Sequence, residues 1–210
     1  MIHSCGRGYR LETFISCIEA MSDGELENPV DEFYRPPEKK SVAEILSADS
    51  GDDALDRYKA SLLGDTASAP QVIIDHSDAR VVIPQSLAII VGGEVKDSID
   101  LRKCCDGASM RLKEGVQYQL RLGFNVQREI VTGLRYLHRV TKMGITIEKE
   151  AYMLGSYGPR MDIHHYNTPV DTAPDGMMQR GKYKIKSKLI DDDEHEYLSW
   201  TWTLDIVKDW

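Results

Sequence analysis

The feature that most constrains the fold of this chain is an alternation of apolar and polar residues with a period of two. It is clearest from Gln117 to Gln127, where the apolar residues are Tyr118, Leu120, Leu122, Phe124 and Val126. Successive side chains of a β-strand point to opposite faces, so this pattern predicts a strand with one buried face. The same period recurs in residues 182–189 and 200–206. In residues 182–189, one face carries Tyr183, Ile185, Ser187 and Leu189. In residues 200–206, one face carries Trp200, Trp202, Leu204 and Ile206.

Shorter apolar runs and turn signals extend the same pattern. Further candidate strands are residues 87–91, 98–101, 134–141 and 145–148. Turns are predicted between strands at Lys113-Glu-Gly, Met143-Gly, Gly158-Pro, Asp175-Gly and Asp191-Asp-Asp. Several short strands with no helix between them are typical of an antiparallel β-sandwich. We therefore expect an all-β domain over residues 80–210.

The chain before this domain has a different composition. Residues 1–40 form an acidic segment, and residues 21–40 are polar and contain proline, so they bury too little apolar surface to offset their ordering entropy. We expect this flexible arm to be disordered in the free protein. Met21, followed by Ser and Asp, is also a plausible translation start, and residues 1–20 are then an alternative extension. Peptides from residues 1–20 in the mass spectrum of the native protein would contradict that hypothesis.

Residues 41–65 predict a short helical hairpin. Ser41 and Glu44 form a capping-box pattern, and Asp52 or Asp53 can cap a second helix over residues 54–63. This second helix carries Leu55, Tyr58 and Leu62 at helical spacing and stops at Gly64. Both helices are shorter than the roughly 12–15 residues that an isolated helix needs in water. They should therefore fold only against the chain's own domain or a partner, and residues 66–79 read as a linker.

The charge is concentrated in the arm. The net charge of the chain is −8, and residues 1–70 hold 7 Lys+Arg against 14 Asp+Glu, whereas residues 71–210 hold 19 against 20. Binding to nucleic acid needs a basic footprint, so we do not expect a nucleic-acid partner. An acidic arm on a near-neutral domain favours a basic protein partner, although a solvated acidic tail has the same composition.

Cysteine usage and hydropathy indicate a cytosolic protein. The 4 cysteines are too few for a disulfide scaffold, and the adjacent Cys104 and Cys105 do not match zinc-site spacings, so we expect reduced thiols. Polar residues interrupt the apolar character of residues 1–20, which therefore do not read as a secretory signal. An amphipathic mitochondrial presequence is an alternative, which the acidic residues that follow disfavour. The apolar run at residues 87–91 is far shorter than the about 20 residues that span a bilayer.

Motifs for catalysis and cofactor binding are not found. His164 and His165 lie beside Asp162, but adjacent residues of a strand point to opposite faces, and no third ligand has a diagnostic spacing. There is no Gly-rich phosphate loop and no nucleophile elbow, and residues 191–194 lack EF-hand spacing. We expect no catalytic residues, no metal and no cofactor.

Longer motifs carry a resemblance to a known family. In the domain they are Leu112-Lys-Glu-Gly-Val-Gln-Tyr, Asn125-Val-Gln-Arg-Glu-Ile-Val-Thr-Gly-Leu-Arg-Tyr, Tyr152-Met-Leu-Gly-Ser-Tyr-Gly-Pro-Arg, Arg180-Gly-Lys-Tyr-Lys-Ile-Lys-Ser and Leu198-Ser-Trp-Thr-Trp. In the arm they are Tyr34-Arg-Pro-Pro, Ser41-Val-Ala-Glu-Ile and Asp52-Asp-Ala-Leu-Asp-Arg-Tyr-Lys. These residues resemble the Rho GDP-dissociation inhibitor family. The similarity spans residues 34–210, is weaker at 66–110, and does not include residues 1–33.

The resemblance implies an immunoglobulin-like β-sandwich with an N-terminal regulatory arm. In that family the helical hairpin of the arm packs on the switch regions of a Rho-, Rac- or Cdc42-type GTPase and blocks nucleotide exchange and hydrolysis. The sandwich takes up the geranylgeranyl group of the prenylated GTPase and thereby extracts it from membranes. A 1:1 complex with a prenylated Rho-family small GTPase is the partner that the resemblance implies.

The resemblance also nominates site residues. For the prenyl pocket they are Ile89, Met110, Tyr118, Ile130, Ile185 and Trp202, among which Met110 stands in for an aromatic residue and Trp202 is the strongest candidate. Each could equally be ordinary core, since alternating apolar residues of strands are core by default. For the GTPase surface they are Asp52, Asp53, Tyr58, Leu62 and Asp193. Asp52 is also sufficient as a helix cap, and for Asp191 and Asp192 we expect a solvated turn.

Two other functions remain open at this stage. A general prenyl-binding chaperone would need the same pocket but would not need the hairpin with Asp52, Tyr58 and Leu62. A structural sandwich adaptor would have no lipid slot. The sequence does not determine which Rho-type GTPase is preferred or whether phosphorylation regulates its release.

Overall fold

The structure is a computed structural model that describes residues 53–55, 57, 72–103 and 105–210. Residues 53–55 and 57 are helical, and the rest of the described chain is built of strands and loops. The strands are β1 (Val82–Val91), β2 (Glu94–Asp100), β3 (Ala108–Lys113), β4 (Gln117–Val126), β5 (Val131–Lys142), β6 (Ile145–Tyr157), β7 (Arg160–Asn167), β8 (Asp171–Thr172), β9 (Gly181–Ile190) and β10 (Glu196–Val207). The prediction of an all-β domain is confirmed.

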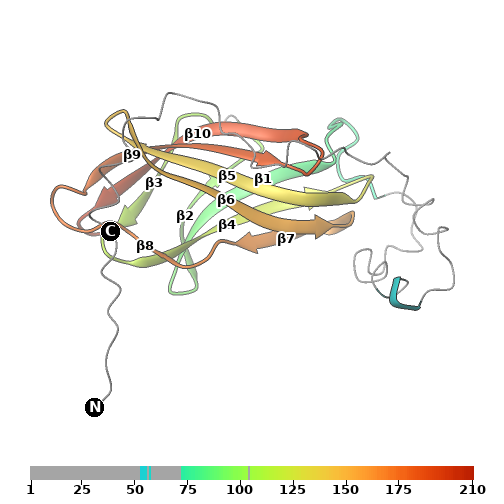
Figure 1. The fold of residues 1–210 in the computed structure, drawn as a ribbon, viewed down its shortest axis with the longest axis horizontal. Coiled ribbons are helices and arrows are strands. Elements are labelled where there is room, and N and C mark those ends of the chain that lie inside the picture. Colours follow the sequence, from blue (N-terminus) through green and yellow to red (C-terminus); the bar gives the residue numbers. More distant parts are fainter. Residues whose placement is uncertain (1–52, 56, 58–71, 104) are drawn as a thin grey trace, which may run out of the picture.

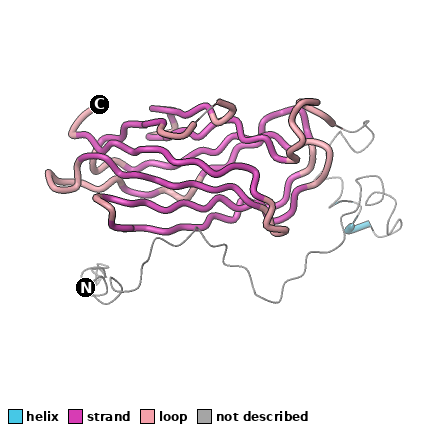
Figure 2. The backbone as a smooth tube through the Cα atoms, turned by 90° about the horizontal axis from the view of Figure 1, so that it is seen from above, coloured by secondary structure: helices cyan, strands magenta, loops and turns pink. Residues whose placement is uncertain are grey.

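The strands form two sheets that pack face to face (Figure 1). One has the order β2-β1-β4-β7, with the short β8 also paired to β4, and the other has the order β3-β10-β9-β5-β6. Strand pairs are antiparallel except β3 and β10, which run parallel. Seen from above, the strands follow the long axis of the domain (Figure 2). This arrangement is an immunoglobulin-like β-sandwich, in which alternate side chains of each strand fill the space between the sheets.

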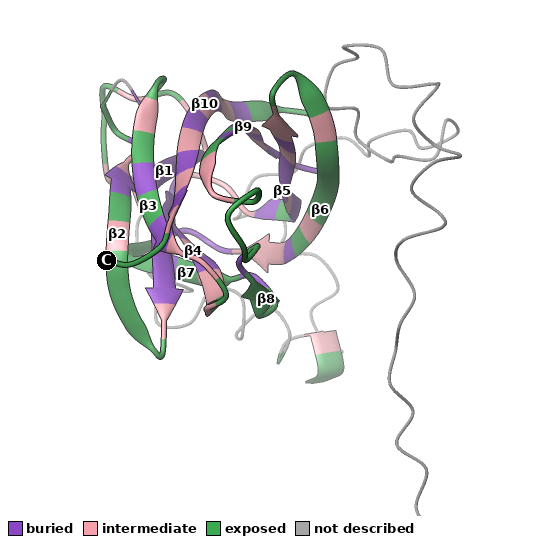
Figure 3. Cartoon of the chain, turned by 90° about the vertical axis from the view of Figure 1, so that its left-hand side faces the viewer, coloured by how far each residue is buried: buried purple, intermediate pink, exposed green. Residues whose placement is uncertain are grey.

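The core lies between the two inner faces. On β10 the inward residues are Trp200, Trp202, Leu204 and Ile206, and none is more than 6% exposed. Buried and more exposed positions alternate along β3, β9 and β10, as the banded strands of Figure 3 show. The period-two patterns at residues 182–189 and 200–206 therefore predicted both the strands and their inward faces correctly.

The prediction of a single buried face for residues 117–127 is wrong in its second half. Gly123, Asn125 and Gln127 are buried as well, although they belong to the polar half of the alternation. Asn125 Nδ2 donates to the Met161 carbonyl at 3.3 Å, and Gln127 is hydrogen-bonded to the segment before β1. Here neighbouring chain covers the outer face of the strand, which a period-two pattern cannot show.

Three strands were not predicted. Strand β3 offers only Met110 and Leu112 as inward apolar residues, and β8 has two residues. Strand β7 is mostly exposed, so its sequence has little hydrophobic alternation. Within the described residues, no helix has the length and apolar character needed to cross a membrane.

Candidate functional site

Four of the six residues nominated for lipid binding lie together in the core. Ile89, Met110, Ile185 and Trp202 belong to one buried cluster and are at most 3% exposed. Ile185 pairs with Trp202 across β9 and β10, and Met110 lies opposite Leu204 across β3 and β10. Ile89 comes from β1 in the facing sheet. Both sheets thus contribute side chains to this group, which is closely packed in the structure.

Tyr118 lies at the edge of the same core. It is near the start of β4, is partly buried, and packs against the core cluster. Its hydroxyl donates a hydrogen bond to Asp171 Oδ2 at 3.2 Å. Burial, with smaller contributions from the nearby carboxylates of Asp171 and Glu148, raises the pKa of Tyr118. Tyr118 therefore has an apolar ring toward the core and a neutral hydroxyl at the rim, a combination suited to the mouth of an apolar slot.

Ile130 is not part of this group. It immediately precedes β5, whereas Ile185 pairs with Val140, ten residues further along that strand. At about 3.3 Å per strand residue the separation is roughly 30 Å. Ile130 is also absent from the core cluster that holds the other four buried candidates. The structure therefore brings five of the six candidates toward one region and leaves Ile130 at the opposite end of the sandwich.

A buried hydroxyl network fixes Trp202. Ser187 is fully buried between the inward residues of β9, and its Oγ accepts a hydrogen bond from Trp202 Nε1 at 3.0 Å. The same oxygen lies 2.9 Å from the Tyr136 hydroxyl. Burial raises the pKa of Tyr136, so this group stays protonated. The pattern had placed Ser187 on the inner face of its strand, but only the fold shows that it pairs with Tyr136 of β5.

His138 and Tyr152 line the inner face next to this network. The His138 ring lies 5.6 Å from the Tyr136 ring and 5.5 Å from the Tyr152 ring, measured between centroids. His138 is 7% exposed, and its Nδ1 has no hydrogen-bond partner within the described part of the chain. Burial lowers the pKa of His138 to about 4, so the imidazole is neutral at pH 7. Neither residue was singled out from the sequence, since a lone histidine on a strand is not informative.

The acidic turn between β9 and β10 is ordered by its own hydrogen bonds. Asp191 is 5% exposed, and its carboxylate accepts hydrogen bonds from the Tyr197 hydroxyl at 2.7 Å and from the His195 backbone N–H at 2.8 Å. The expectation of a solvated turn is therefore wrong for Asp191, although the predicted bond to local backbone is present. Asp193 is partly exposed, and carboxylate and imidazole atoms of Asp191, Asp193 and His195 lie within 4.8 Å of one another.

Asp192 makes contacts that a solvated residue would not. Its carboxylate forms an ion pair with Arg135 on β5, and both side chains are partly buried. It also lies against Gly133, where an added Cβ would be 1.7 Å from Asp192 Oδ2. Gly133 has a φ of +58°, which glycine adopts at little cost. The solvated-turn expectation is thus wrong for Asp192 too, because β5 supplies a partner that is distant in sequence.

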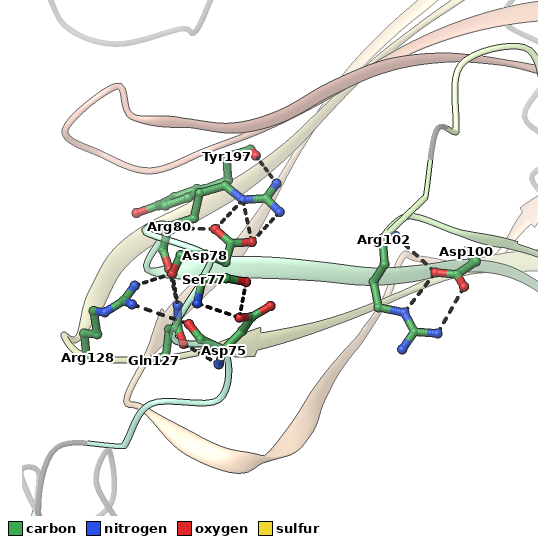
Figure 4. Close-up of polar contacts among 9 residues, drawn as sticks. All are labelled: Asp75, Ser77, Asp78, Arg80, Asp100, Arg102, Gln127, Arg128 and Tyr197. Carbon is green, nitrogen blue, oxygen red and sulfur yellow. Dashed lines mark hydrogen bonds and ion pairs between the residues drawn. The ribbon is translucent and has the colours of Figure 1, made fainter.

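The segment that leads into β1 is tied to the sandwich by Gln127 and Arg128 (Figure 4). Gln127 Oε1 accepts the backbone N–H groups of Ile74 and Asp75, both at 3.0 Å. Gln127 Nε2 donates to the carbonyls of Asp78 and Arg80, both at 2.8 Å. Arg128 donates to the Asp78 carbonyl as well. One buried side chain therefore satisfies four backbone groups and fixes where the chain enters the domain.

This anchor is linked to the acidic turn. Arg80 pairs with the Asp78 carboxylate and also donates to the Tyr197 carbonyl at 3.0 Å, while the Tyr197 hydroxyl binds Asp191. The segment before β1 and the β9–β10 turn therefore meet at one end of the sandwich. Tyr118 and the β5–β6 turn lie toward the other end, because β4 starts there and ends beside the anchor, and β5 starts beside the acidic turn and ends there.

The nominated arm residues are mostly beyond what the structure describes. Asp52, Tyr58 and Leu62 lie outside the described residues. Asp53 is helical and exposed. The helical hairpin and its contacts with a partner stay predictions.

Comparison with known proteins identifies the family. The family model described as RHO protein GDP dissociation inhibitor matches residues 19–209. The chain is 44% identical to a probable rho GDP-dissociation inhibitor of Caenorhabditis elegans, over 90% of this chain and 100% of the relative. It is 39% identical to Rho GDP-dissociation inhibitor 1 of Homo sapiens, over 91% and 95%, and 38% identical to Rho GDP-dissociation inhibitor 3 of Bos taurus, over 84% and 78%. The chain belongs to the Rho GDP-dissociation inhibitor family.

Proposed function

We propose that this protein binds prenylated Rho-family small GTPases, slows their release of GDP, and keeps them off membranes by holding the geranylgeranyl group between its two sheets. The observation that carries the proposal is the family match over residues 19–209, which includes both the arm and the sandwich. A match to the sandwich alone would leave the arm, and with it the action on the nucleotide, without support.

The sandwich core suits the lipid-binding half of this function. A geranylgeranyl chain exposed to water is unfavourable by about 0.8 kcal/mol for each CH₂ that could be buried. Ile89, Met110, Ile185 and Trp202 offer an apolar surface from both sheets. Because these side chains are packed together in the structure, lipid entry requires the two sheets to part or the side chains to change rotamer. Tyr118, at the rim of the core, is the residue beside which the chain would enter.

The end of the sandwich that carries the anchor suits the second part of the proposed function, contact with the GTPase itself. There the chain leaves toward the arm, and the partly exposed Asp193 lies in the β9–β10 turn that Tyr197 connects to the anchor. Acidic groups in this region attract a basic partner surface through complementary charge. Asp52, Asp53, Tyr58 and Leu62 would contact the switch regions from the arm, and the complex would contain one copy of each protein.

A titration of GDP-loaded Rho GTPase with the full chain tests the proposal. The prenylated and unprenylated forms are followed side by side for nucleotide release and for extraction from liposomes. We expect slower GDP release and removal of the prenylated form from the membrane. Tight binding of a prenylated peptide with no effect on nucleotide, and no preference for Rho proteins, would instead support a general prenyl-binding chaperone.

The Asp52→Ala variant separates the inhibition of GDP release from the binding of the lipid. We predict weaker inhibition of GDP release, because the variant removes a hydrogen-bond acceptor for the switch region, and largely unchanged affinity for a geranylgeranylated peptide. A matched control is Asp162→Ala, which removes the same charge from an exposed position of β7. Equal loss of peptide affinity and of inhibition in Asp52→Ala would contradict the division of labour between arm and sandwich.

A further inference from the structure

The outer face of the β3-β10-β9-β5-β6 sheet carries a basic groove. It has a volume of about 720 Å³, and its lining includes Arg139, Lys182, Lys184, Lys186, Thr201 and Thr203. The remaining lining residues are Gly107, which precedes β3, and threonine, glycine and methionine residues at the β5–β6 turn, so no carboxylate lines the groove among the described residues. Lys184 and Lys186 flank Ile185 on β9, so the groove lies on the reverse side of the strands that carry Ile185 and Trp202.

The strand register places like charges directly opposite one another across this face. Lys186 of β9 pairs with Arg139 of β5, and Arg139 in turn pairs with Lys149 of β6. Like charges at directly opposed positions of a sheet are destabilising. Three neighbouring strands thus place three cations in one row.

A second row beside the first supplies hydroxyl groups. Thr203 of β10 pairs with Lys184, Lys184 pairs with Thr141 of β5, and Thr141 pairs with Thr146 of β6. In the described part of the chain, no ion pair is formed by Lys182, Lys184, Lys186 or Lys149, whereas the next lysine of β9, Lys188, pairs with Glu196 at 2.9 Å. Asp205 of β10 lies opposite Lys182, so the positive charge with no carboxylate directly opposite it belongs to Lys184 and Lys186.

The two rows together have the chemistry of a phosphate site. Ammonium and guanidinium groups bind phosphate oxygens through charge-assisted hydrogen bonds, and threonine hydroxyls add neutral donors. Neighbouring cations are spaced by about 5 Å across strands and about 7 Å along β9. That spacing suits several phosphate groups on one ligand better than a single phosphate ion. Residues 71–210 hold 19 Lys+Arg against 20 Asp+Glu, so the groove concentrates positive charge in a domain that is near neutral overall.

We propose that this groove binds a compact ligand that carries several phosphate groups, either a soluble polyphosphorylated cyclitol or the phosphorylated head group of a membrane lipid. The proposal does not rest on the proposed function, since the groove is on the outer face of the sheet and shares no side chain with the inner core. A lipid head group held there would place the wall formed by Ile185 and Trp202 close to a membrane surface.

Binding is tested with the full chain at 150 mM salt, about physiological ionic strength. Isothermal titration calorimetry with inositol hexakisphosphate tests binding of a soluble polyphosphorylated ligand. Cosedimentation with phosphatidylcholine vesicles containing phosphatidylinositol 4,5-bisphosphate tests the lipid source, against phosphatidylserine vesicles of the same total charge. We expect saturable binding to at least one of the two phosphorylated probes, and weaker binding to the phosphatidylserine vesicles.

The variant K184Q/K186Q removes two groove cations from outward positions that the core does not use. We expect it to weaken binding of the phosphorylated probe at least tenfold. The control K103Q/K113Q removes the same charge from outside the groove and should change binding less than twofold. Equal effects of the two variants would mean that binding depends on the net charge of the protein and not on the groove, and would overturn the proposal. Undetectable binding by the unmodified full chain would overturn it as well.

Discussion

Gly133 lies against the Asp192 carboxylate at a point where the first residues of β5 approach the β9–β10 turn. Its φ of +58° is close to that of Gly92, at +60°, in the β1–β2 turn. A Cβ on Gly92 would meet nothing within 4 Å, whereas a Cβ on Gly133 would be 1.7 Å from Asp192 Oδ2. The two glycines therefore differ in their surroundings and hardly at all in backbone conformation.

Alanine substitutions separate these two effects. We predict that Gly92→Ala lowers the free energy of unfolding by about 1 kcal/mol, the cost of the left-handed conformation. Gly133→Ala should cost at least about 2 kcal/mol more, since it also displaces the partly buried Asp192–Arg135 pair. Urea unfolding of both variants measures the difference, and equal losses would show that the contact with Asp192 does not matter.

His138 makes the stability of the core depend on pH. Its pKa is about 4 in the folded protein, against an ordinary value of 6.5 in the unfolded chain. Between these values the unfolded state binds more protons, so the free energy of unfolding falls as the pH drops from about 6.5 to 4 and is unaffected by this group below 4. The full loss is up to about 3 kcal/mol.

The variant His138→Leu tests this dependence. We predict that it loses less stability between pH 7 and pH 4.5 than the unmodified chain does, by up to about 2 kcal/mol. His164, whose pKa is also lowered to about 4, is present in both proteins, so its contribution cancels. Parallel unfolding curves at each pH measure the difference, and identical slopes would mean that His138 titrates normally in the fold.

At the scale of elements, strand β9 carries two lysines whose surroundings differ in charge. Lys186 is opposite Arg139, and Lys188 is paired with Glu196. We predict that Lys186→Glu raises the free energy of unfolding by about 0.2–1 kcal/mol, because it replaces a repulsive cross-strand pair with an attractive one. Lys188→Glu should lower it by a similar amount. Both are measured by thermal unfolding at low salt, and destabilisation by Lys186→Glu would show that the cation row is not repulsive.

The strands also show which features of the fold the sequence patterns predict and which they miss. Alternation located β4, β9 and β10 and the inward faces of the last two, because each buries one side along its length. It missed β7, which is exposed on most of its residues. It also failed where a polar residue is buried by distant chain: nothing near Gln127 or Asp192 in the sequence indicates the segment before β1 or Arg135.

The site residues divide in the same way. Motif resemblance nominated five residues that the fold brings toward one region of the core, at its centre or its rim. Ile130, nominated on the same grounds, lies at the other end, since motifs carry no information on distance along a strand. The hydroxyl network of Ser187, Tyr136 and Trp202 depends on the pairing of β5 with β9, which no local pattern specifies.

At the scale of the whole molecule, the sandwich has two ends with different chemistry. One end holds the anchor of residues 72–80 and the acidic turn, and Tyr197 joins them. Toward the other end lie Tyr118 and the start of β9. A GTPase held by the arm at one end and by its lipid in the core would contact the protein at two separate places. Each contact then raises the effective concentration of the other.

The measurement that tests this account most directly is the response of the tryptophan indole N–H signals to geranylgeranyl-cysteine methyl ester in ¹⁵N NMR spectra. The chain has 3 tryptophans: Trp202 is fully buried and bonded to Ser187, Trp200 is buried nearby, and Trp210 is 56% exposed at the C-terminus. The account predicts a saturable shift of the Trp202 signal while the Trp210 signal stays in place. Binding of the lipid with no change at Trp202 would contradict a site between the sheets.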